Sequence, residues 1–158
     1  MRTLLIESQE LAGRSTVVRR GTMTVPEMQA WFSNVYGEIA SILRKRGIAP
    51  AGPPFARYRV LPGRRFEVEA GFPVAESVRP DGTVRVSSLP AGPAAVTVHV
   101  GPYDQLGSTY AAVAEWLRLR GATPAGDPWE IYLDPPEGDS ADWRTEIVQP
   151  YHPALDVE

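Results

Sequence analysis

The chain has 158 residues, of which 43% are hydrophobic and 22% are charged, and its formal net charge is −3. This composition indicates one soluble globular domain over residues 1–158. It excludes a disordered chain, and the small negative charge gives no general attraction to nucleic acid or anionic membranes. The absence of cysteine excludes disulfides and thiolate chemistry, and no apolar run is long enough for a signal peptide or a membrane span, so we expect a cytoplasmic protein.

The first half of the chain predicts two strands, a helix and two further strands. Thr24 and Glu27 have the spacing of a capping box around Pro26, apolar residues then recur at helical spacing, and Gly47 follows the last of them. The predicted elements are strands at about 3–8, 15–20, 55–60 and 65–70, and a helix at about 25–46.

The second half predicts the same order of elements. Its helix carries an apolar stripe that includes Leu106, Tyr110 and Val113, and Gly121 ends it. The predicted elements are strands at about 83–88, 95–100, 129–133 and 144–149, and a helix at about 104–120, with residues 77–85 joining the halves.

The two halves are related in sequence. RKRGIAPAGPPFARY (44–58) and RLRGATPAGDPWEIY (118–132) agree at eight of fifteen positions with a constant offset of 74. Three weaker matches extend the repeat: VVRRGTM with TVHVGPY, QELAGRS with SSLPAGP, and RRFEVEA with WRTEIVQ, which sets Glu67 opposite Glu146. We therefore expect repeat one at about 1–78 and repeat two at about 81–152.

This repeat predicts an α+β fold. Neither half offers enough core to be stable alone, because about seventy residues supply one helix on a small sheet. We expect two β-β-α-β-β repeats related by a pseudo-twofold axis, with an antiparallel-rich sheet, two main helices and a central groove.

Glu130 is an acid within the apolar strand WEIYL, and its repeat mate is Ala56. In the first half, Ala56, Tyr58 and Val60 alternate with two arginines, which predicts that the Ala56 face is covered. Glu130 is then predicted to point to a covered face, although a solvent-facing acid is the ordinary alternative. A covered carboxylate needs a proton, a hydrogen-bond donor or a cation. If the same alternation holds in the second half, Trp129 lies on the strand face that corresponds to the arginines of the first half. The strand at 129–133 must then be covered on both faces, or its register must differ from that of the first half.

Several segments of the sequence resemble a known family. The sequence resembles the GyrI-like small-molecule-binding domain, the effector-binding domain of multidrug-responsive AraC- and MerR-type regulators, an SHS2-like repeat. The segments that carry the resemblance are GPPFARY (52–58), VEAGFPV (68–74), HVGPYDQLGSTYAAVAEWL (99–117), GATPAGDPWEIYLDPP (121–136) and ADWRTEIVQP (141–150).

The resemblance implies a stand-alone domain that binds hydrophobic or cationic aromatic small molecules for sensing, sequestration or drug resistance. By motif, the family's buried acid falls on Glu130. Aromatic and pliable side chains would complete the ligand site, each with a core role as its alternative; the candidates are Tyr58, Tyr103, Tyr132, Trp31, Phe72 and Met23, the last as repeat mate of Tyr103. Because no helix-turn-helix precedes the first strand, we expect no direct nucleic-acid binding.

Two other functions use features of the same sequence. Some GyrI-like proteins hydrolyse cyclopropane-containing electrophilic toxins, and Glu130 with a tyrosine would suit that chemistry as the catalytic base and polarising acid. A gyrase-inhibitor-like factor that binds protein would need an exposed patch, for which the acidic loop 134–142 is the candidate.

The remaining polar residues predict structural roles. His99 is expected to be a strand residue with satisfied ring nitrogens, and Glu69 a structural anchor. The acids Asp134, Glu137, Asp139 and Asp142 have the Pro and Gly spacing of a solvated loop, so we expect no metal site there and no cofactor.

Overall fold

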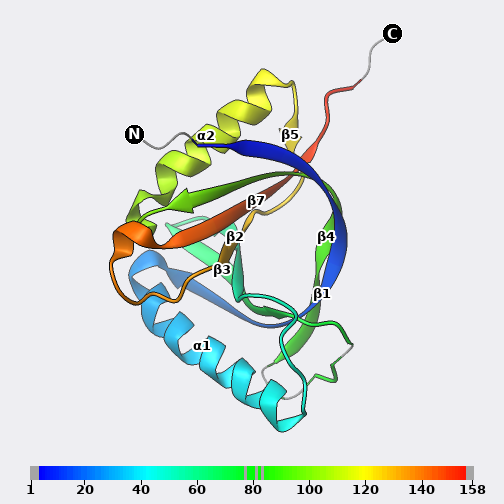
Figure 1. Cartoon of the computed structure of the whole chain (residues 1–158), viewed down its shortest axis with the longest axis vertical. Coiled ribbons are helices and arrows are strands. Elements are labelled where there is room, and N and C mark those ends of the chain that lie inside the picture. The colour runs from blue at the N-terminus through cyan, green and yellow to red at the C-terminus, as the bar shows by residue number, and fades with distance from the viewer. Residues whose placement is uncertain (1–3, 77, 81, 83, 156–158) are drawn as a thin grey trace. The chain divides into compact units, whose positions relative to one another are not determined.

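The computed structural model describes residues 4–76, 78–80, 82 and 84–155. Within them the chain forms an α+β fold with two α-helices and seven strands whose pairings are antiparallel, as the sequence predicts (Figure 1). The strands are β1 (Ile6–Thr24), β2 (Phe55–Leu61), β3 (Arg65–Pro73), β4 (Arg85–Val100), β5 (Thr123–Pro124), β6 (Trp129–Tyr132) and β7 (Arg144–His152). The helices are α1 (Val25–Lys45) and α2 (Leu106–Leu119), with short 3₁₀ helices at Tyr103–Gln105 and Ser140–Asp142.

The chain divides into two compact units. The α1 unit is Ala12–Pro90, and the α2 unit combines Met1–Leu11 with Ala91–Glu158. In the α1 unit, β3 lies between β1 and β2, and α1 contacts β3. In the α2 unit, β7 lies between β4 and β6, and α2 contacts β7. The expectation of a single domain, and those of a pseudo-twofold axis and a central groove, stay predictions.

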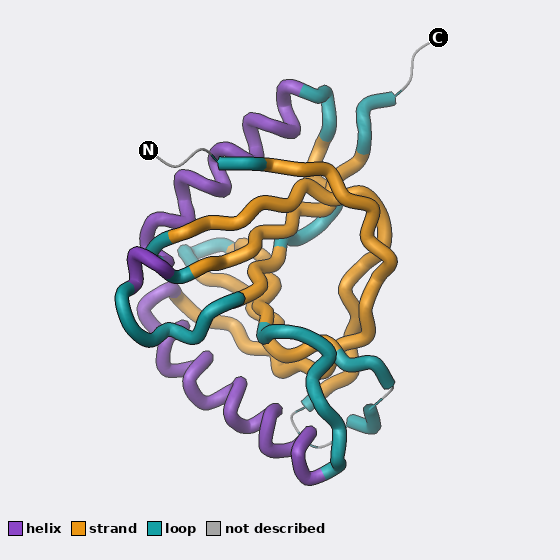
Figure 2. The backbone as a smooth tube through the Cα atoms, in the orientation of Figure 1, coloured by secondary structure: helices purple, strands orange, loops and turns teal. Residues whose placement is uncertain are grey.

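The number of predicted strands is wrong in two places. The strands predicted at 3–8 and 15–20 form one long strand, β1, and those predicted at 83–88 and 95–100 form another, β4 (Figure 2). Residues 3 and 83 lie outside the described residues. The segments QELAGRS and SSLPAGP lie within β1 and β4, so each strand continues through its segment. Gly13 (φ 82°) and Gly92 (φ 121°) absorb the local change of direction within each strand. The chain passes from one unit to the other beside these two glycines.

Both helices end in the same hydrogen-bonded motif. At the end of α1, the amide N–H of Gly47 donates to Arg44 O (3.1 Å) and that of Ile48 donates to Leu43 O (2.9 Å). At the end of α2, Gly121 donates to Arg118 O (3.1 Å) and Ala122 donates to Leu117 O (3.0 Å). These paired bonds satisfy the last helix carbonyls and stop each helix where its glycine predicts.

The start of α1 also follows the sequence. The Glu27 carboxylate accepts a hydrogen bond from the Thr24 N–H (2.9 Å), which confirms the capping box, and this bond lowers the pKa of Glu27. The second helix begins later than predicted, at Leu106, because Tyr103–Gln105 form a 3₁₀ turn. A short strand that was not predicted, β5, follows α2 and pairs with the end of β7.

The register of the strands corrects the sequence alignment by two residues. Arg57 faces Glu69 across β2 and β3, and its repeat mate Ile131 faces Glu146 across β6 and β7. Glu146 therefore corresponds to Glu69, not to Glu67. A shift of two keeps every side chain on its own face of a strand, which explains why the hydrophobic pattern did not reveal it.

The same shift separates Met23 from Tyr103. Met23 lies in β1 opposite Phe66, whereas Tyr103 lies beyond the end of β4 in the 3₁₀ turn. These two residues are therefore not repeat mates. The alignment had matched the glycines Gly21 and Gly101, which occupy different ladder positions.

Candidate functional site

Glu130 is buried in the α2 unit, with 6% of its surface exposed. The prediction that it points to a covered face is confirmed, and its repeat mate Ala56 is fully buried. Trp129 is also buried at 3%, so β6 is covered on both faces. The same reasoning is wrong for Val60, which is 76% exposed because it lies at the end of β2 beside the Pro62–Arg64 turn.

Two tyrosine hydroxyls hold the Glu130 carboxylate. Tyr110 on α2 donates to Oε2 at 2.6 Å, and Tyr132 on β6 donates to Oε1 at 2.9 Å. Hydroxyl donors stabilise the charged form of a buried carboxylate and offset part of its desolvation cost. Burial and the adjacent charge of Glu130 raise the pKa of Tyr110 far above its ordinary value, so this hydroxyl remains a donor at all physiological pH values.

Two further aromatic rings extend this group of side chains from Tyr132. The Tyr103 ring lies 5.7 Å from the Tyr132 ring, and the Trp143 ring lies 5.0 Å from Tyr103, measured between centroids. Burial raises the pKa of Tyr103, with smaller contributions from the charges of Glu130 and Asp134. We call Glu130 and these four aromatic residues the carboxylate–aromatic cluster; its aromatic members are Tyr103, Tyr110, Tyr132 and Trp143.

The strand face beneath α2 is unusually polar for a core. Side chains of Glu130, His99 and Thr145 are buried on β6, β4 and β7, and Thr145 is paired in register with both Tyr132 and His99. His99 Nδ1 lies 2.8 Å from Thr109 Oγ1 and its Nε2 lies 3.2 Å from Pro102 O. The prediction that both ring nitrogens are satisfied is confirmed, and His99 fixes α2 over the sheet.

The remaining predicted site residues belong to the α1 unit. Trp31, Tyr58 and Phe72 are joined through Phe32 and Tyr36, with centroid distances between 5.4 and 6.5 Å. Met23 is 4% exposed and packs with Trp31 over Gly21. These side chains form an aromatic cluster within the α1 unit, and within the α2 unit Glu130 is grouped with the predicted residues Tyr103 and Tyr132.

Sequence reasoning missed Tyr110 and Trp143. Tyr110 had been placed in the apolar stripe of its helix, and Trp143 at the start of a strand. A signal for Tyr110 was present, because Tyr36 precedes it by the repeat offset of 74. In the α1 unit Tyr36 donates to Phe55 O at 2.7 Å, whereas Tyr110 donates to the carboxylate that replaces Ala56.

Glu69 is a structural anchor, as the sequence predicts. Its carboxylate accepts from Arg20 Nε at 2.8 Å and from Ser87 Oγ at 2.8 Å. Among the described residues there is no group of three or more His, Asp or Glu side chains that could hold a metal ion. No helix of the described chain is both long and apolar enough to cross a membrane.

Comparison with known proteins identifies the family of this chain. The profile of the GyrI-like small molecule binding domain matches residues 9–152, so the chain belongs to this family. No curated protein matches the sequence significantly.

Solved structures share the fold. The C-terminal domain of EcmrR superposes with a TM-score of 0.81 at 22% identity, covering 97% of this chain and 100% of that domain. In the EcmrR–DNA complex the TM-score is 0.83 at 21% identity, covering 96% of this chain, which spans 58% of the EcmrR chain. A hydrolase from Listeria innocua gives 0.71 at 13% identity, covering 93% and 91% of the two chains. SAV2435 bound to tetraphenylphosphonium gives 0.67 at 14% identity, covering 94% of each.

Proposed function

We propose that this domain binds hydrophobic cationic aromatic molecules at the carboxylate–aromatic cluster. The observation that carries the proposal is the buried Glu130 carboxylate, which accepts from Tyr110 and Tyr132, together with the Tyr103 ring beside Tyr132 and the Trp143 ring beside Tyr103. A carboxylate attracts a cation through its charge, and ring faces attract the same cation through their quadrupoles. Sensing, sequestration and drug resistance are the roles that such binding would serve.

The chemistry of one structural neighbour supports this ligand class. SAV2435, which shares the fold, was solved with tetraphenylphosphonium, a cation surrounded by four phenyl rings. A ligand of this kind carries a delocalised charge that costs little to desolvate, and its rings can pack against tyrosine and tryptophan.

The test compares a cation with a neutral molecule of similar shape. Tetraphenylphosphonium and triphenylphosphine oxide are titrated against the wild type and Glu130→Gln, and binding is followed by calorimetry. We expect Glu130→Gln to weaken binding of the cation at least tenfold, about 1.4 kcal/mol, and to change binding of the neutral compound much less.

A matched control separates charge at the site from overall charge. Glu10→Gln removes one negative charge at an exposed position of β1 and should leave both affinities unchanged. If the cation binds Glu130→Gln as tightly as the wild type, the assignment of Glu130 as its charge partner is wrong.

Hydrolysis of cyclopropane-containing electrophiles is the second candidate, favoured by the 2.6 Å Tyr110–Glu130 hydrogen bond and by the fold shared with the Listeria hydrolase. Glu130 would act as base on water while a tyrosine hydroxyl polarises the conjugated carbonyl. A carboxylate oxygen that accepts from a tyrosine hydroxyl keeps a second lone pair, through which it can accept from a water molecule. Product formation by the wild type that is lost in Glu130→Gln, with binding of the electrophile retained, would favour hydrolysis.

A further inference from the structure

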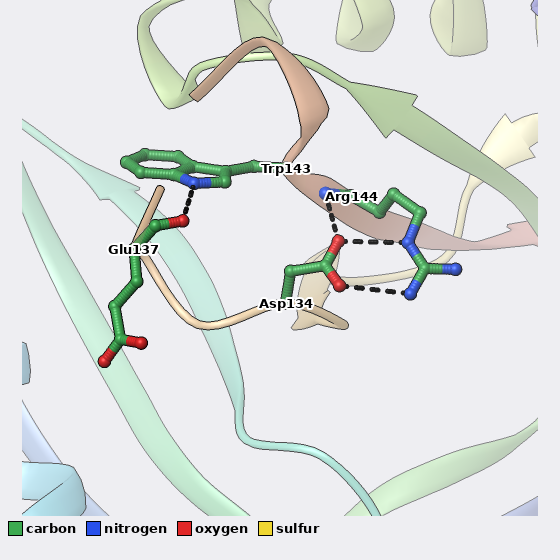
Figure 3. A network of polar contacts seen from close by, with 4 residues as sticks. All are labelled: Asp134, Glu137, Trp143 and Arg144. Atoms are coloured by element: carbon green, nitrogen blue, oxygen red, sulfur yellow. Dashed lines mark hydrogen bonds and ion pairs between the residues drawn. The ribbon is translucent and has the colours of Figure 1, made fainter. Parts of the chain in front are cut away.

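The loop that joins β6 to β7 is held closed by one ion pair. The Asp134 carboxylate accepts from the Arg144 backbone N–H at 2.9 Å, from its Nε at 3.0 Å and from its Nη2 at 3.1 Å (Figure 3). These bonds lower the pKa of Asp134 and keep it charged. A fork of this kind fixes direction as well as distance, so it sets where the loop leaves β6 and where it enters β7.

The same loop fixes Trp143 at both its ring and its backbone. The indole Nε1–H donates to Glu137 O at 2.9 Å, as Figure 3 shows, and Trp143 O accepts from the Gly101 N–H at 2.8 Å. The Asp139 side chain caps the 3₁₀ turn that precedes Trp143 by accepting from Ala141 N at 3.0 Å. The only polar atom of the Trp143 side chain is thus bonded within the loop, and its ring lies against that of Tyr103.

The acids of this loop are partly used inside it. Asp134 binds Arg144 and Asp139 caps the turn, which leaves Glu137 and Asp142 as exposed side chains. Two of the four acids of this loop, which was the candidate for protein binding, therefore have hydrogen-bond partners inside it. Their bonds help to hold the segment that ends at Trp143.

We propose that Trp143 is a ligand-contacting ring that extends the site from Glu130 through Tyr132 and Tyr103, and that the Asp134–Arg144 ion pair is its positioning device. This inference rests on the proposed function, since it assigns a further wall to the same site. The four rings and the acid select cations that carry several aromatic groups over small aliphatic cations. Tryptophan is the strongest cation–π acceptor among the aromatic side chains, so its loss removes more than contact area.

The positioning role predicts a particular pattern of effects. Both charged side chains are partly exposed, with 54% of Arg144 and 30% of Asp134 accessible, and ion pairs of this exposure contribute little to global stability. Breaking the pair should therefore weaken ligand binding while the melting temperature hardly changes.

Tetraphenylphosphonium and tetramethylammonium are the probes for Trp143. We expect Trp143→Ala to weaken the binding of tetraphenylphosphonium at least tenfold, and Trp143→Phe to weaken it about threefold. Tetramethylammonium should bind weakly to the wild type and to every variant. The wild type should show tryptophan quenching by the phosphonium ligand that Trp143→Phe largely loses. Trp116→Phe is the control, since Trp116 packs on Tyr151 and Arg120 in the same unit, outside the cluster.

The ion pair is tested with Asp134→Asn and Arg144→Lys. Asp134→Asn should weaken binding of the phosphonium ligand several-fold and reduce its quenching of Trp143 fluorescence. Arg144→Lys keeps the charge but loses the paired guanidinium hydrogen bonds, so its affinity should lie between those of Asp134→Asn and the wild type. Wild-type affinity and quenching in Asp134→Asn would overturn the positioning role.

The outcomes for Trp143 and Glu130 are distinguishable. Wild-type affinity in Trp143→Ala and Trp143→Phe, with weakened binding in Glu130→Gln, overturns the inference and leaves the proposed function standing. Weakened binding in the Trp143 variants alone supports the aromatic wall and contradicts the charge role of Glu130.

Discussion

Glu130 differs from its repeat mate Ala56 in carrying a buried carboxylate. Tyr36 and Tyr110 occupy equivalent helix positions, as do Tyr58 and Tyr132 on the strands. Tyr110 and Tyr132 donate to the Glu130 carboxylate, whereas the α1 unit has Ala56 at the corresponding strand position. The replacement of Ala56 by Glu130 between the two halves thus gives two tyrosines a buried carboxylate as their hydrogen-bond acceptor.

Glu146 is a second half-buried acid with a different environment. Its cross-strand neighbours are Ile131 and Val98, whereas the corresponding Glu69 lies between Arg57 and Arg20. Burial raises the pKa of Glu146 above its ordinary value near 4.5. The folded state then holds this proton more tightly than the unfolded chain, so stability falls as pH rises from about 4.5 through the folded-state pKa.

Glu146→Gln should remove that loss of stability. We expect the variant to melt at a higher temperature than the wild type at pH 7, and the difference to shrink toward pH 4, where Glu146 is protonated in both states. Thermal unfolding across this range measures the effect, and Glu10→Gln at an exposed position serves as control. A melting difference that does not change with pH would contradict the burial explanation.

At the scale of elements, sequence periodicity predicted the helices well and the strand boundaries poorly. α1 was expected at 25–46 and spans Val25–Lys45, because capping and glycine signals are local. The merging of two predicted strands into β1 was not predictable, since Ala-Gly segments are compatible with a turn and with a bent strand. Only the partner strand decides between them.

Gly71 on β3 is the position where backbone proximity is greatest. A Cβ at Gly71 would lie 1.8 Å from Val17 O on β1, whereas one at Gly37 on α1 meets nothing within 4 Å. Gly71→Ala should therefore lower the free energy of unfolding by about 3 kcal/mol or more through overpacking. Gly37→Ala should raise it by about 0.5–1 kcal/mol by favouring the helix. Denaturant unfolding of the pair checks both signs, and a stable Gly71→Ala protein would refute the close approach.

At the scale of the whole molecule, the compact units do not follow chain order. The first eleven residues belong with residues 91–158. Ile6 packs on the core cluster of Ala95, Val113, Leu117 and Ala122, Thr97 Oγ1 donates to Leu5 O at 2.7 Å, and Ser8 Oγ lies 2.6 Å from the Tyr151 hydroxyl. The beginning of the sequence therefore completes the unit that contains Glu130.

Substitution of two adjacent residues tests this assignment. Ile6→Ala should lower the free energy of unfolding by about 1–2 kcal/mol, because it removes methyl groups packed on the α2 core. Leu5→Ala, at a side chain that is 68% exposed, should change it by less than about 0.5 kcal/mol. Faster amide exchange in α2 of Ile6→Ala, measured by mass spectrometry, would locate the loss. Equal stability of the two variants would contradict the packing of Ile6.

The sequence by itself determined the α+β class, the twofold repetition, the limits of α1 and the burial of Glu130. These follow from local periodicity, capping residues and comparison of two halves of one chain, so no tertiary information is needed. The tertiary structure alone decided that Tyr110 from α2 and Tyr132 from β6 meet at Glu130, and that Trp143 lies against Tyr103 next to the Asp134–Arg144 pair. Such contacts depend on strand register and loop closure, and a register shift of two leaves the hydrophobic pattern unchanged while it moves every partner.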